Sequence, residues 1–424
     1  MIIDLPYSKG EVSIEIPDRN LRFLIDRGKL PAAKDIRGEV IRALRDPIAC
    51  QPLSKLVRPD SKVVIVGDDL TRPTPQKIIM PAVLDELNSC GVRDDRIEVL
   101  IGLGTHRQMS EVEISEKYGK EVVERVRIHN HDYMDDRALV YMGTTESDIP
   151  VYVNRMLFDA DFVMCIGNLV PHETAGWGGG GKGIQPGVCG EETTVYTHVM
   201  ATKMLVEGRT MAGDPDNPMR KEIELVARKA GLRMILNTVL NEKNEVSKVF
   251  AGDLVRAHRE GVEHAKRAYM PEVPSLVDAM IVACKPADID YWQGLKPLAY
   301  ASEVVKLGGS VVLVAEFPDG ISPTHPQVRD MGRWSIKEVL NAIEDERVPG
   351  GDIIGASTML LHAKIRERVE IMCYSGGMTE GDKEALGMAH VGSLEEALEL
   401  VFRRYGRDAS IGVMKSGDIL PRVL

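Results

Sequence analysis

The chain has 424 residues. This is longer than a domain with a single hydrophobic core usually is, so two domains are expected. Its 44% hydrophobic and 28% charged residues are ordinary for a soluble globular protein. The net charge of −11 argues against nucleic acid or an anionic membrane as a partner, and an acidic substrate would need cations placed locally.

Cysteine usage and the N-terminus bear on the cellular compartment. The six cysteines are scattered without a C-x-x-C pair, which indicates neither a zinc ribbon nor a disulfide framework. No apolar run approaches the length of about 18 residues expected of a membrane span. The N-terminus also lacks the basic region and long apolar stretch of a signal peptide. We therefore expect a cytoplasmic protein.

The first part of the chain alternates strands and helices. Residues 2–6 and 12–16 predict a hairpin, and residues 36–45 are helix-prone. Buried strands are predicted over 62–66, 97–101 and 162–166, with a helix over 76–90 after the first of them. Strands that alternate with helices pair in parallel, so the loops after these three strands should share one edge of one sheet.

The second part begins a new series of the same kind. Two strand-like runs over 234–240 and 246–252 precede a helix over 254–269, and residues 270–274 are the most linker-like stretch. After it we expect strands over 277–284, 310–316 and 369–374, and helices over 292–307, 335–344 and 394–405. The domains are therefore placed at 1–270 and 271–424, and the last residues either stay with the second domain or pack back on the first. The fold class is α/β, each domain a largely parallel sheet flanked by helices, with the active site in the interdomain cleft.

The segment 171–198 has a composition that no ordinary core or surface element needs. Its many glycines are tolerated where a backbone takes positive φ or comes very close to a ligand, and a lysine after them is typical of an anion nest. Gly176, Gly181 and Lys182 match the G-x-x-x-x-G-K of a P-loop. Gly183, however, stands where that motif has Ser or Thr, and the run does not flow directly from the preceding strand.

Four pieces of the sequence resemble the nickel-pincer lactate racemase family. They are DLTRP at 69–73, GTH at 104–106, the glycine-rich segment, and QGLK at 293–296, in matching order over about 230 residues. The resemblance implies an isomerase that racemises or epimerises a 2-hydroxy acid, lactate or a relative, by reversible hydride transfer.

The resemblance also implies a cofactor. This is the nickel-pincer nucleotide, a pyridinium mononucleotide whose two sulfur arms clamp nickel. By motif match, Lys182 is the covalent attachment point and His198 the nickel ligand, and one imidazole with sulfur donors suits square-planar nickel. The residues expected against the cofactor are Gly179, Gly180 and Gly181. Cofactor-synthesis enzymes are then transient partners, and a homo-oligomer is one alternative for the oligomeric state.

Two histidines are the candidate acid–base pair. Inverting a stereocentre requires proton-accepting groups on both faces, and His106 and His172 each lie in a loop after a strand. The α-hydrogen of a 2-hydroxy acid is a poor acid beside the carboxylate. Removing it as hydride, while a histidine takes the hydroxyl proton, gives a flat 2-keto acid but needs an electron-accepting cofactor. The resemblance assigns His106 and His172 to this pair.

Cations are expected at the substrate carboxylate. Arg72 precedes Pro73, and its guanidinium fork matches a carboxylate, although a loop salt bridge with Asp69 is the alternative. The resemblance assigns Arg72 to the substrate, with Asp69 as a polar support. Gln293 and Lys296 are spaced i, i+3 on a predicted helix, so both project from one face, and Lys296 would add a second positive charge.

An alternative of a different class is a phosphate-ligand-binding or nucleotide-hydrolysing protein that uses the glycine-rich segment alone. The enzyme requires the histidines and Arg72 to face that segment, whereas the binding protein does not. The motifs do not fix which 2-hydroxy acid is used. No role is assigned to the seven other histidines, His129, His131, His258, His264, His325, His362 and His390.

Overall fold

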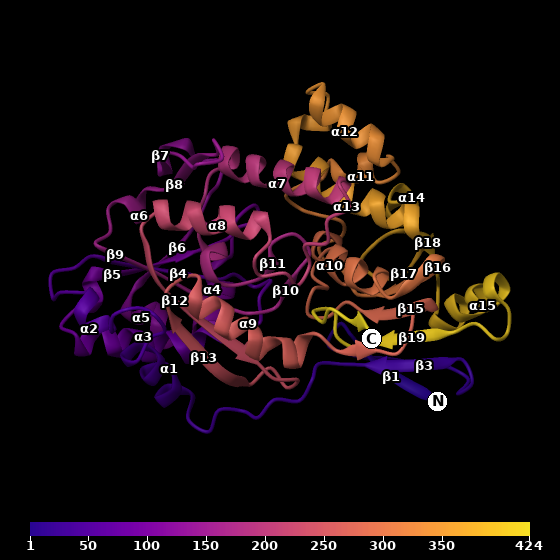
Figure 1. Ribbon diagram of the computed structural model, residues 1–424, viewed down its shortest axis with the longest axis horizontal. Coiled ribbons are helices and arrows are strands. Elements are labelled where there is room, and N and C mark those ends of the chain that lie inside the picture. The colour runs from indigo at the N-terminus through magenta and orange to yellow at the C-terminus, as the bar shows by residue number, and fades with distance from the viewer. The chain divides into compact units, whose positions relative to one another are not determined.

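The computed structural model describes residues 1–424, which divide into two compact units (Figure 1). Unit 1 comprises Met1–Gly28, Thr202–Arg209 and Ala268–Leu424, and unit 2 comprises Lys29–Ala201 and Thr210–Arg267. Each unit is built on a six-stranded sheet flanked by helices. The α/β fold class predicted from the sequence is confirmed.

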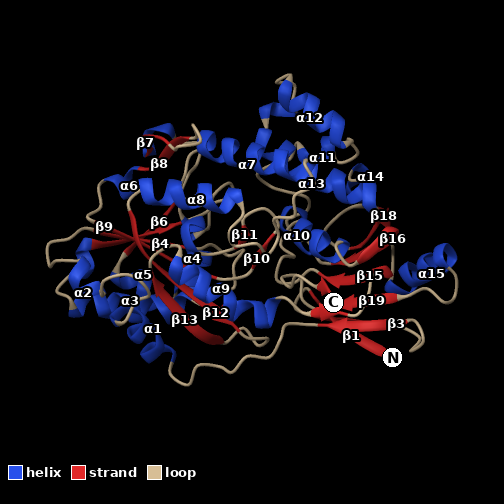
Figure 2. Ribbon diagram, in the orientation of Figure 1, coloured by secondary structure: helices blue, strands red, loops and turns tan.

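The sheet of unit 2, whose strands are among those drawn red in Figure 2, has the order β13-β12-β9-β4-β5-β6. Its strands are β4 (Val63–Gly67), β5 (Ile97–Ile101), β6 (Arg127–Asn130), β9 (Phe162–Asn168), β12 (Leu232–Leu240) and β13 (Val246–Gly252). All neighbours run parallel except β12 and β13, which form an antiparallel pair. Because β9, β4 and β5 are adjacent and parallel, the loops after them lie at one sheet edge, as predicted.

Helices cover both faces of this sheet, because its central strand is apolar throughout and must be buried on both sides. All five residues of β4 are buried, as expected for a parallel strand between two helical layers. Val63 and Ile65 pack with α1 (Ile36–Arg45) and α3 (Gln76–Ser89). Val64 packs on the opposite side with α8 (Pro218–Lys229) and α9 (Arg256–Tyr269).

The remaining elements that begin in unit 2 are short or lie outside the main sheet. They are α2 (Leu53–Leu56), α4 (Glu111–Tyr118), α5 (Lys120–Arg125), α6 (Arg155–Phe158), α7 (Glu191–Val206), the β7 (Leu139–Thr144) and β8 (Pro150–Asn154) pair, and the β10 (Pro171–His172) and β11 (Gly176–Trp177) pair.

The sheet of unit 1 has the order β18-β17-β16-β15-β19-β3 and is parallel throughout. Its strands are β3 (Leu21–Ile25), β15 (Val277–Ala283), β16 (Val305–Val314), β17 (Glu370–Tyr374), β18 (Ala389–His390) and β19 (Ile411–Met414). The other elements are α10 (Tyr291–Ser302), α11 (Val328–Met331), α12 (Ile336–Glu344), α13 (Ile353–Arg368), α14 (Glu380–Ala385), α15 (Leu394–Tyr405), β14 (Glu272–Val273) and β20 (Arg422–Val423).

The N-terminal residues group with unit 1, whereas the sequence analysis placed them in the first domain. The predicted hairpin is confirmed as β1 (Ile2–Tyr7) and β2 (Gly10–Glu15), and its buried side chains join the core of the unit 1 sheet. The unpredicted strand β3 pairs with β19, near the other end of the chain. This pairing of distant segments leaves no local signal in the sequence.

The helix predicted over 292–307 is wrong at its end. The structure ends α10 at Ser302 and starts β16 at Val305. The β-branched Val304 and Val305, with glycines at 308 and 309, favour an extended backbone over a helix.

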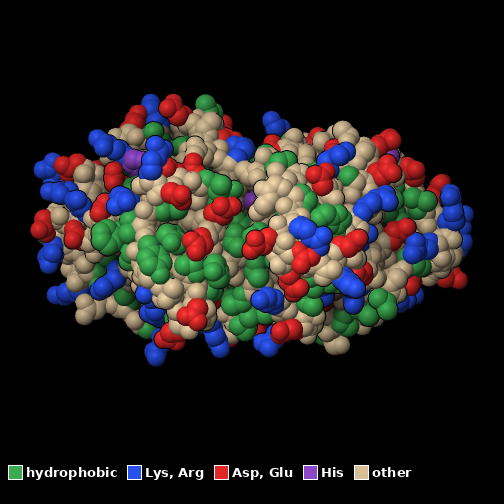
Figure 3. All heavy atoms as spheres, turned by 90° about the horizontal axis from the view of Figure 1, so that it is seen from above, with side chains coloured by type: hydrophobic (Ala, Val, Ile, Leu, Met, Phe, Trp, Pro, Cys, Tyr) green, Lys and Arg blue, Asp and Glu red, His purple; other side chains and the backbone are tan.

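Charges of both signs are interspersed on the face drawn in Figure 3, so the net charge of −11 does not form one acidic patch there. No helix has both the length and the apolar sequence that crossing a membrane requires.

Candidate active site

The loop after β4 is tied to the helices beside it through Asp68. Tyr118 Oη donates to the Asp68 carbonyl at 3.0 Å, and Gln76 Nε2 donates to Asp68 Oδ1 at 2.9 Å. Lys117 Nζ lies 3.4 Å from Asp68 Oδ1 and donates to the Arg72 carbonyl at 2.6 Å. Both ends of the loop are therefore fixed to α3 and α4 at the carboxyl edge of the sheet.

Asp69 and His106 are in direct contact across two of these loops. Asp69 Oδ2 lies 2.5 Å from His106 Nδ1, and the Asp69 side chain is buried. Burial raises the pKa of Asp69, but the charge and hydrogen bond of His106, aided by Arg72 and Thr71, outweigh it and hold that pKa below its usual range. A carboxylate only accepts, so Nδ1 carries a hydrogen, and in the neutral ring His106 Nε2 presents a lone pair. This is the arrangement of a histidine prepared to act as a base.

Thr71 connects Asp69 to Arg72. Its Oγ1 donates to Asp69 Oδ1 at 2.5 Å and accepts from Arg72 Nη1 at 2.9 Å. The Asp69 carboxylate and the Arg72 guanidinium are thus linked through the Thr71 hydroxyl. Sequence reasoning gave Thr71 no role, although its position between the two residues was visible.

His172 is held in the opposite tautomer. Its Nδ1 accepts from the backbone amides of Thr174 and Ala175, both at 3.3 Å. Because an amide N–H only donates, the hydrogen of the neutral ring lies on Nε2. The Glu173 carboxylate, 3.4 Å from the same Nδ1, supplies a counter-charge for the protonated ring. In the neutral rings, His172 Nε2 can therefore donate a hydrogen bond, whereas His106 Nε2 can accept one.

The loops after β4, β5 and β9 touch one another. Gly104 N donates to Gly187 O at 2.9 Å, which joins the loop of His106 to the end of the glycine-rich segment. A Cβ added at Gly167 would lie 3.7 Å from Asp68 Oδ2 and 3.9 Å from Gly179 Cα. The loops that carry the predicted catalytic, carboxylate-binding and attachment residues of unit 2 thus form one cluster.

The glycine loop, residues 176–183, packs closely against protein. Gly179 and Gly180 have φ of 67° and 60°, where glycine is favoured. A Cβ at Gly180 would approach His258 Cδ2 to 2.8 Å, and one at Gly181 would approach α8 to 3.0 Å. Gly180 and Gly181 are therefore packed closely against α9 and α8, and the positive φ that the sequence analysis expected is present at Gly179 and Gly180. The approach of a ligand to these glycines stays a prediction.

Lys182 lies in a short 3-10 helix, η3 (Gly180–Gly183), and its N–H donates to Gly179 O at 3.2 Å. The β10–β11 pair precedes the loop, and no α-helix starts until Glu191. A P-loop runs directly from a strand into a helix, so this loop does not have P-loop architecture.

His198 lies on α7, and its Nδ1 is 2.8 Å from Thr194 O. The carbonyl accepts, so Nε2 presents the lone pair, the orientation common among metal-ligating histidines. Gln185 Nε2 donates to Thr197 Oγ1 at 2.7 Å and ties α7 to the end of the glycine-rich segment. No group of three or more His, Cys, Asp or Glu in the chain could hold a metal ion.

Gln293 and Lys296 belong to unit 1, whereas the other predicted residues belong to unit 2. They lie on α10, where the Asp290 side chain caps the helix by accepting from Gln293 N at 2.8 Å. Lys296 Nζ donates to Gln293 Oε1, so the two side chains share one helix face, as their spacing predicted.

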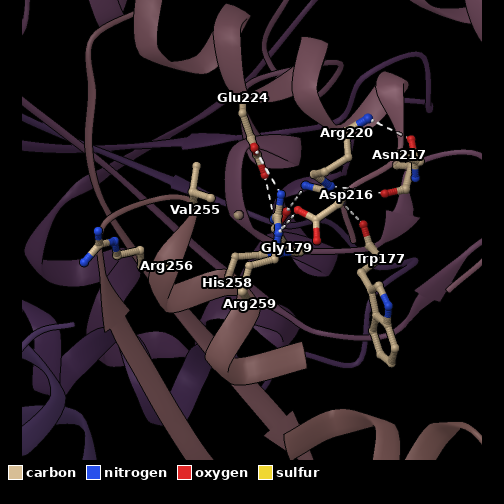
Figure 4. Close-up of polar contacts among 12 residues, drawn as sticks. Trp177, Gly179, Asp216, Asn217, Arg220, Glu224, Val255, Arg256, His258 and Arg259 are labelled. Carbon is tan, nitrogen blue, oxygen red and sulfur yellow. Dashed lines mark hydrogen bonds and ion pairs between the residues drawn. The ribbon is translucent and has the colours of Figure 1, made fainter. Parts of the chain in front are cut away.

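Figure 4 shows polar contacts to the glycine loop that were not predicted from the sequence. Arg220 of α8 and His258 of α9 donate to carbonyls of the loop. From β12, Asn237 Oδ1 accepts from Gly180 N at 2.9 Å. These residues lie between 41 and 80 positions from their partners in the sequence and in no motif. No local signal could have identified them.

Known proteins are similar to this chain in sequence. The family model described as the lactate racemase N-terminal domain matches residues 7–209. A lactate racemase of Lactiplantibacillus plantarum is 28% identical over 424 residues, 98% of each chain. A lactate racemase of Thermoanaerobacterium thermosaccharolyticum is 29% identical over 322 residues, 75% of each chain.

Solved structures share the fold. The lactate racemase apoprotein from Thermoanaerobacterium thermosaccharolyticum matches with a TM-score of 0.87 and 23% identity, covering 100% of both chains. A crystal structure of a protein from Thermotoga maritima matches with a TM-score of 0.72 and 21% identity, covering 94% of this chain and 100% of the other.

Proposed function

We propose a reaction from the premise that this chain belongs to the lactate racemase family and is an isomerase. The chain racemises or epimerises a 2-hydroxy acid, lactate or a related 2-hydroxycarboxylate. The observation that carries the proposal is the pair of histidines in opposite tautomers: Asp69 leaves a lone pair on His106 Nε2, and two backbone amides leave a hydrogen on His172 Nε2.

The two tautomers suit a reaction that must run in both directions. His106 Nε2 accepts the hydroxyl proton of one enantiomer, and His172, when both of its nitrogens carry hydrogen, returns a proton from Nε2 and becomes neutral. Asp69 stabilises the imidazolium that forms at His106, and Glu173, 3.4 Å from His172 Nδ1, stabilises the imidazolium at His172. In the reverse direction the two rings exchange roles.

The residues present fit the nickel-pincer nucleotide that the family resemblance implies. Lys182 is the proposed attachment point, Gly179, Gly180 and Gly181 lie beside it, and His198 Nε2 has the lone pair that a metal requires. When bound, the group supplies an electron acceptor for the α-hydrogen, which no amino-acid side chain can provide.

Arg72 is the proposed partner of the substrate carboxylate. Thr71 and Asp69 hold its guanidinium on one side, and a fork of this kind binds a carboxylate through two parallel hydrogen bonds. Gln293 and Lys296 of unit 1 are proposed to bind the same carboxylate. The position of the active site in the interdomain cleft remains a prediction.

A panel of single-enantiomer 2-hydroxy acids tests this function. Protein made with nickel and the cofactor-synthesis enzymes is incubated with lactate, malate and longer aliphatic, aromatic and sugar acids, and the products are separated by chiral chromatography. We expect conversion of at least one acid from both enantiomers, and none with His106→Ala or His172→Ala. If loaded wild-type protein converts no acid, the proposed function is wrong.

A further inference from the structure

Arg220 is a buried cation that donates hydrogen bonds to backbone carbonyls. It is 0% exposed, and burial lowers its pKa to about 10 despite the charge of Glu224, so it stays protonated at neutral pH. Its Nε donates to Ala175 O at 3.1 Å, Nη1 to Gly179 O at 3.2 Å, and Nη2 to Trp177 O. An apolar side chain could fill this volume without desolvating a charge, so the fork is best explained by the three carbonyls it holds.

His258 holds a fourth carbonyl through a fixed tautomer. Its Nδ1 lies 2.9 Å from Arg259 Nη1, and a guanidinium only donates, so the hydrogen of His258 lies on Nε2 and donates to Gly178 O at 2.9 Å. Arg259 is itself held by Glu224 at 2.7 Å and Asp216 at 3.0 Å (Figure 4). Burial, then the charges of the two arginines, lower the pKa of His258 well below its usual value, which keeps the ring neutral.

The loop is held from two sides. Every carbonyl from residue 175 to residue 179 accepts a hydrogen bond, the one at Gly176 from the backbone of residue 213. On another side, Asn237 accepts from Gly180 N. The Gly179 carbonyl is shared by Arg220 Nη1 and by the N–H of Lys182, so one oxygen joins Arg220 to the backbone of Lys182.

We propose that Arg220 and His258 are positioning residues for Lys182. By holding the peptide planes of residues 175–179, they fix η3 in the conformation that presents the lysine for covalent attachment of the cofactor. The identity of the group attached to Lys182 rests on the proposed function. The fixed conformation of the loop rests on the hydrogen bonds described above. When the loop is already fixed, binding the group costs no further ordering of the backbone. Fixing the loop also matters because a small displacement of a reacting atom slows a reaction severely.

The test compares Arg220→Met, which removes the charge and the fork, with Arg220→Lys, which keeps the charge alone, and with His258→Phe. The control is Arg256→Gln, because Arg256 is exposed and points away from the cluster in Figure 4. Proteins made with nickel and the cofactor-synthesis enzymes are purified as folded monodisperse species. The Lys182 adduct is then quantified by intact mass, and amide exchange of residues 176–183 is measured on protein made without those enzymes.

We expect Arg220→Met to lower the rate of adduct formation by roughly 10- to 100-fold. Arg220→Lys and His258→Phe should have intermediate effects, and Arg256→Gln should behave as wild type. Amide exchange should accelerate in residues 176–183 while β4 and β5 stay protected, which a general loss of stability would not produce. Should Arg220→Met fail to fold, the two milder variants carry the same comparison.

Wild-type loading by folded Arg220→Met, or by both milder variants, would overturn the proposal. If the wild type itself gains no adduct, the proposed function fails, and amide exchange alone then decides the positioning role. In that case, unchanged exchange in residues 176–183 of the variants would show that these residues do not fix the loop.

Discussion

Replacing Asp69 by asparagine should reverse the tautomer of His106. Asp69 Oδ1 accepts from Thr71 N at 3.0 Å and from Thr71 Oγ1 at 2.5 Å, while Oδ2 faces His106 Nδ1 at 2.5 Å. Asparagine has one carbonyl oxygen, and the two Thr71 donors keep it at the Oδ1 position. The amide NH2 then faces His106 Nδ1, which must accept, so the hydrogen moves to Nε2.

The cost of this change can be estimated for both activity and stability. An Asp→Asn change that leaves a catalytic histidine in the wrong tautomer lowers kcat by about 10⁴ in serine proteases, and we expect about 10³ to 10⁴ here. Losing a charged hydrogen bond at a buried site costs about 1.5–3 kcal/mol of unfolding free energy. The two contacts to Thr71 are retained, so the loss should lie toward the lower end.

The same pair makes stability depend on pH in the acid range. The pKa of folded Asp69 lies below its unfolded value of about 3.9, so the unfolded chain takes up the proton first. The stabilisation is complete well above that unfolded pKa and is lost as the pH falls toward the folded pKa. The unfolding free energy of wild type should therefore fall more steeply below about pH 4 than that of Asp69→Asn.

Three measurements on Asp69→Asn check this reasoning. Nitrogen-15 NMR of protein without cofactor reports which nitrogen of His106 carries the hydrogen, chiral chromatography gives kcat, and urea unfolding across pH gives stability. The reasoning is refuted if His106 keeps its hydrogen on Nδ1 in the variant, or if kcat stays within a few-fold of wild type.

Three further predictions concern the cofactor and the substrate. Lys182→Ala should lose the mass adduct that wild type gains with nickel and the cofactor-synthesis enzymes, and active wild type of unmodified mass would contradict covalent attachment. His198→Ala should lose nickel, measured by elemental analysis, while keeping the organic adduct, and full nickel occupancy would reassign the ligand. Arg72→Ala should raise KM by an amount equivalent to about 1.5–3 kcal/mol, with nickel content unchanged, and an unaltered KM would remove Arg72 from the carboxylate site.

Local sequence patterns were sufficient for the sheet and for the convergence of its loops. The apolar runs at 62–66, 97–101 and 162–166 became adjacent parallel strands, because buried β-branched segments between helices have few other arrangements. The positions of His106 and Lys182 in the loops after those strands followed from the same argument. Their chemical roles came from the family resemblance and remain proposals.

Long-range contacts could not be predicted in this way. The pairing of β3 with β19 joins opposite ends of the chain, and the contact of His258 with Gly178 spans 80 residues. Neither leaves a periodic or local signal. The glycine loop illustrates the same limit. Its composition predicted that something approaches the backbone closely, but it did not indicate whether that neighbour is a ligand or another part of the protein. The tautomers of His106 and His172 likewise depend on partners that only the folded chain supplies.

The central claim is that the α-hydrogen moves as hydride while the two histidines move only the hydroxyl proton. Its most direct test uses one enantiomer of an accepted 2-hydroxy acid carrying deuterium at the α-carbon, incubated with loaded protein in ordinary water. Mass spectrometry of the opposite enantiomer, separated by chiral chromatography, should show deuterium retained at the α-carbon. Replacement of that deuterium by solvent hydrogen would mean that a base removes the α-hydrogen as a proton, and would contradict the account.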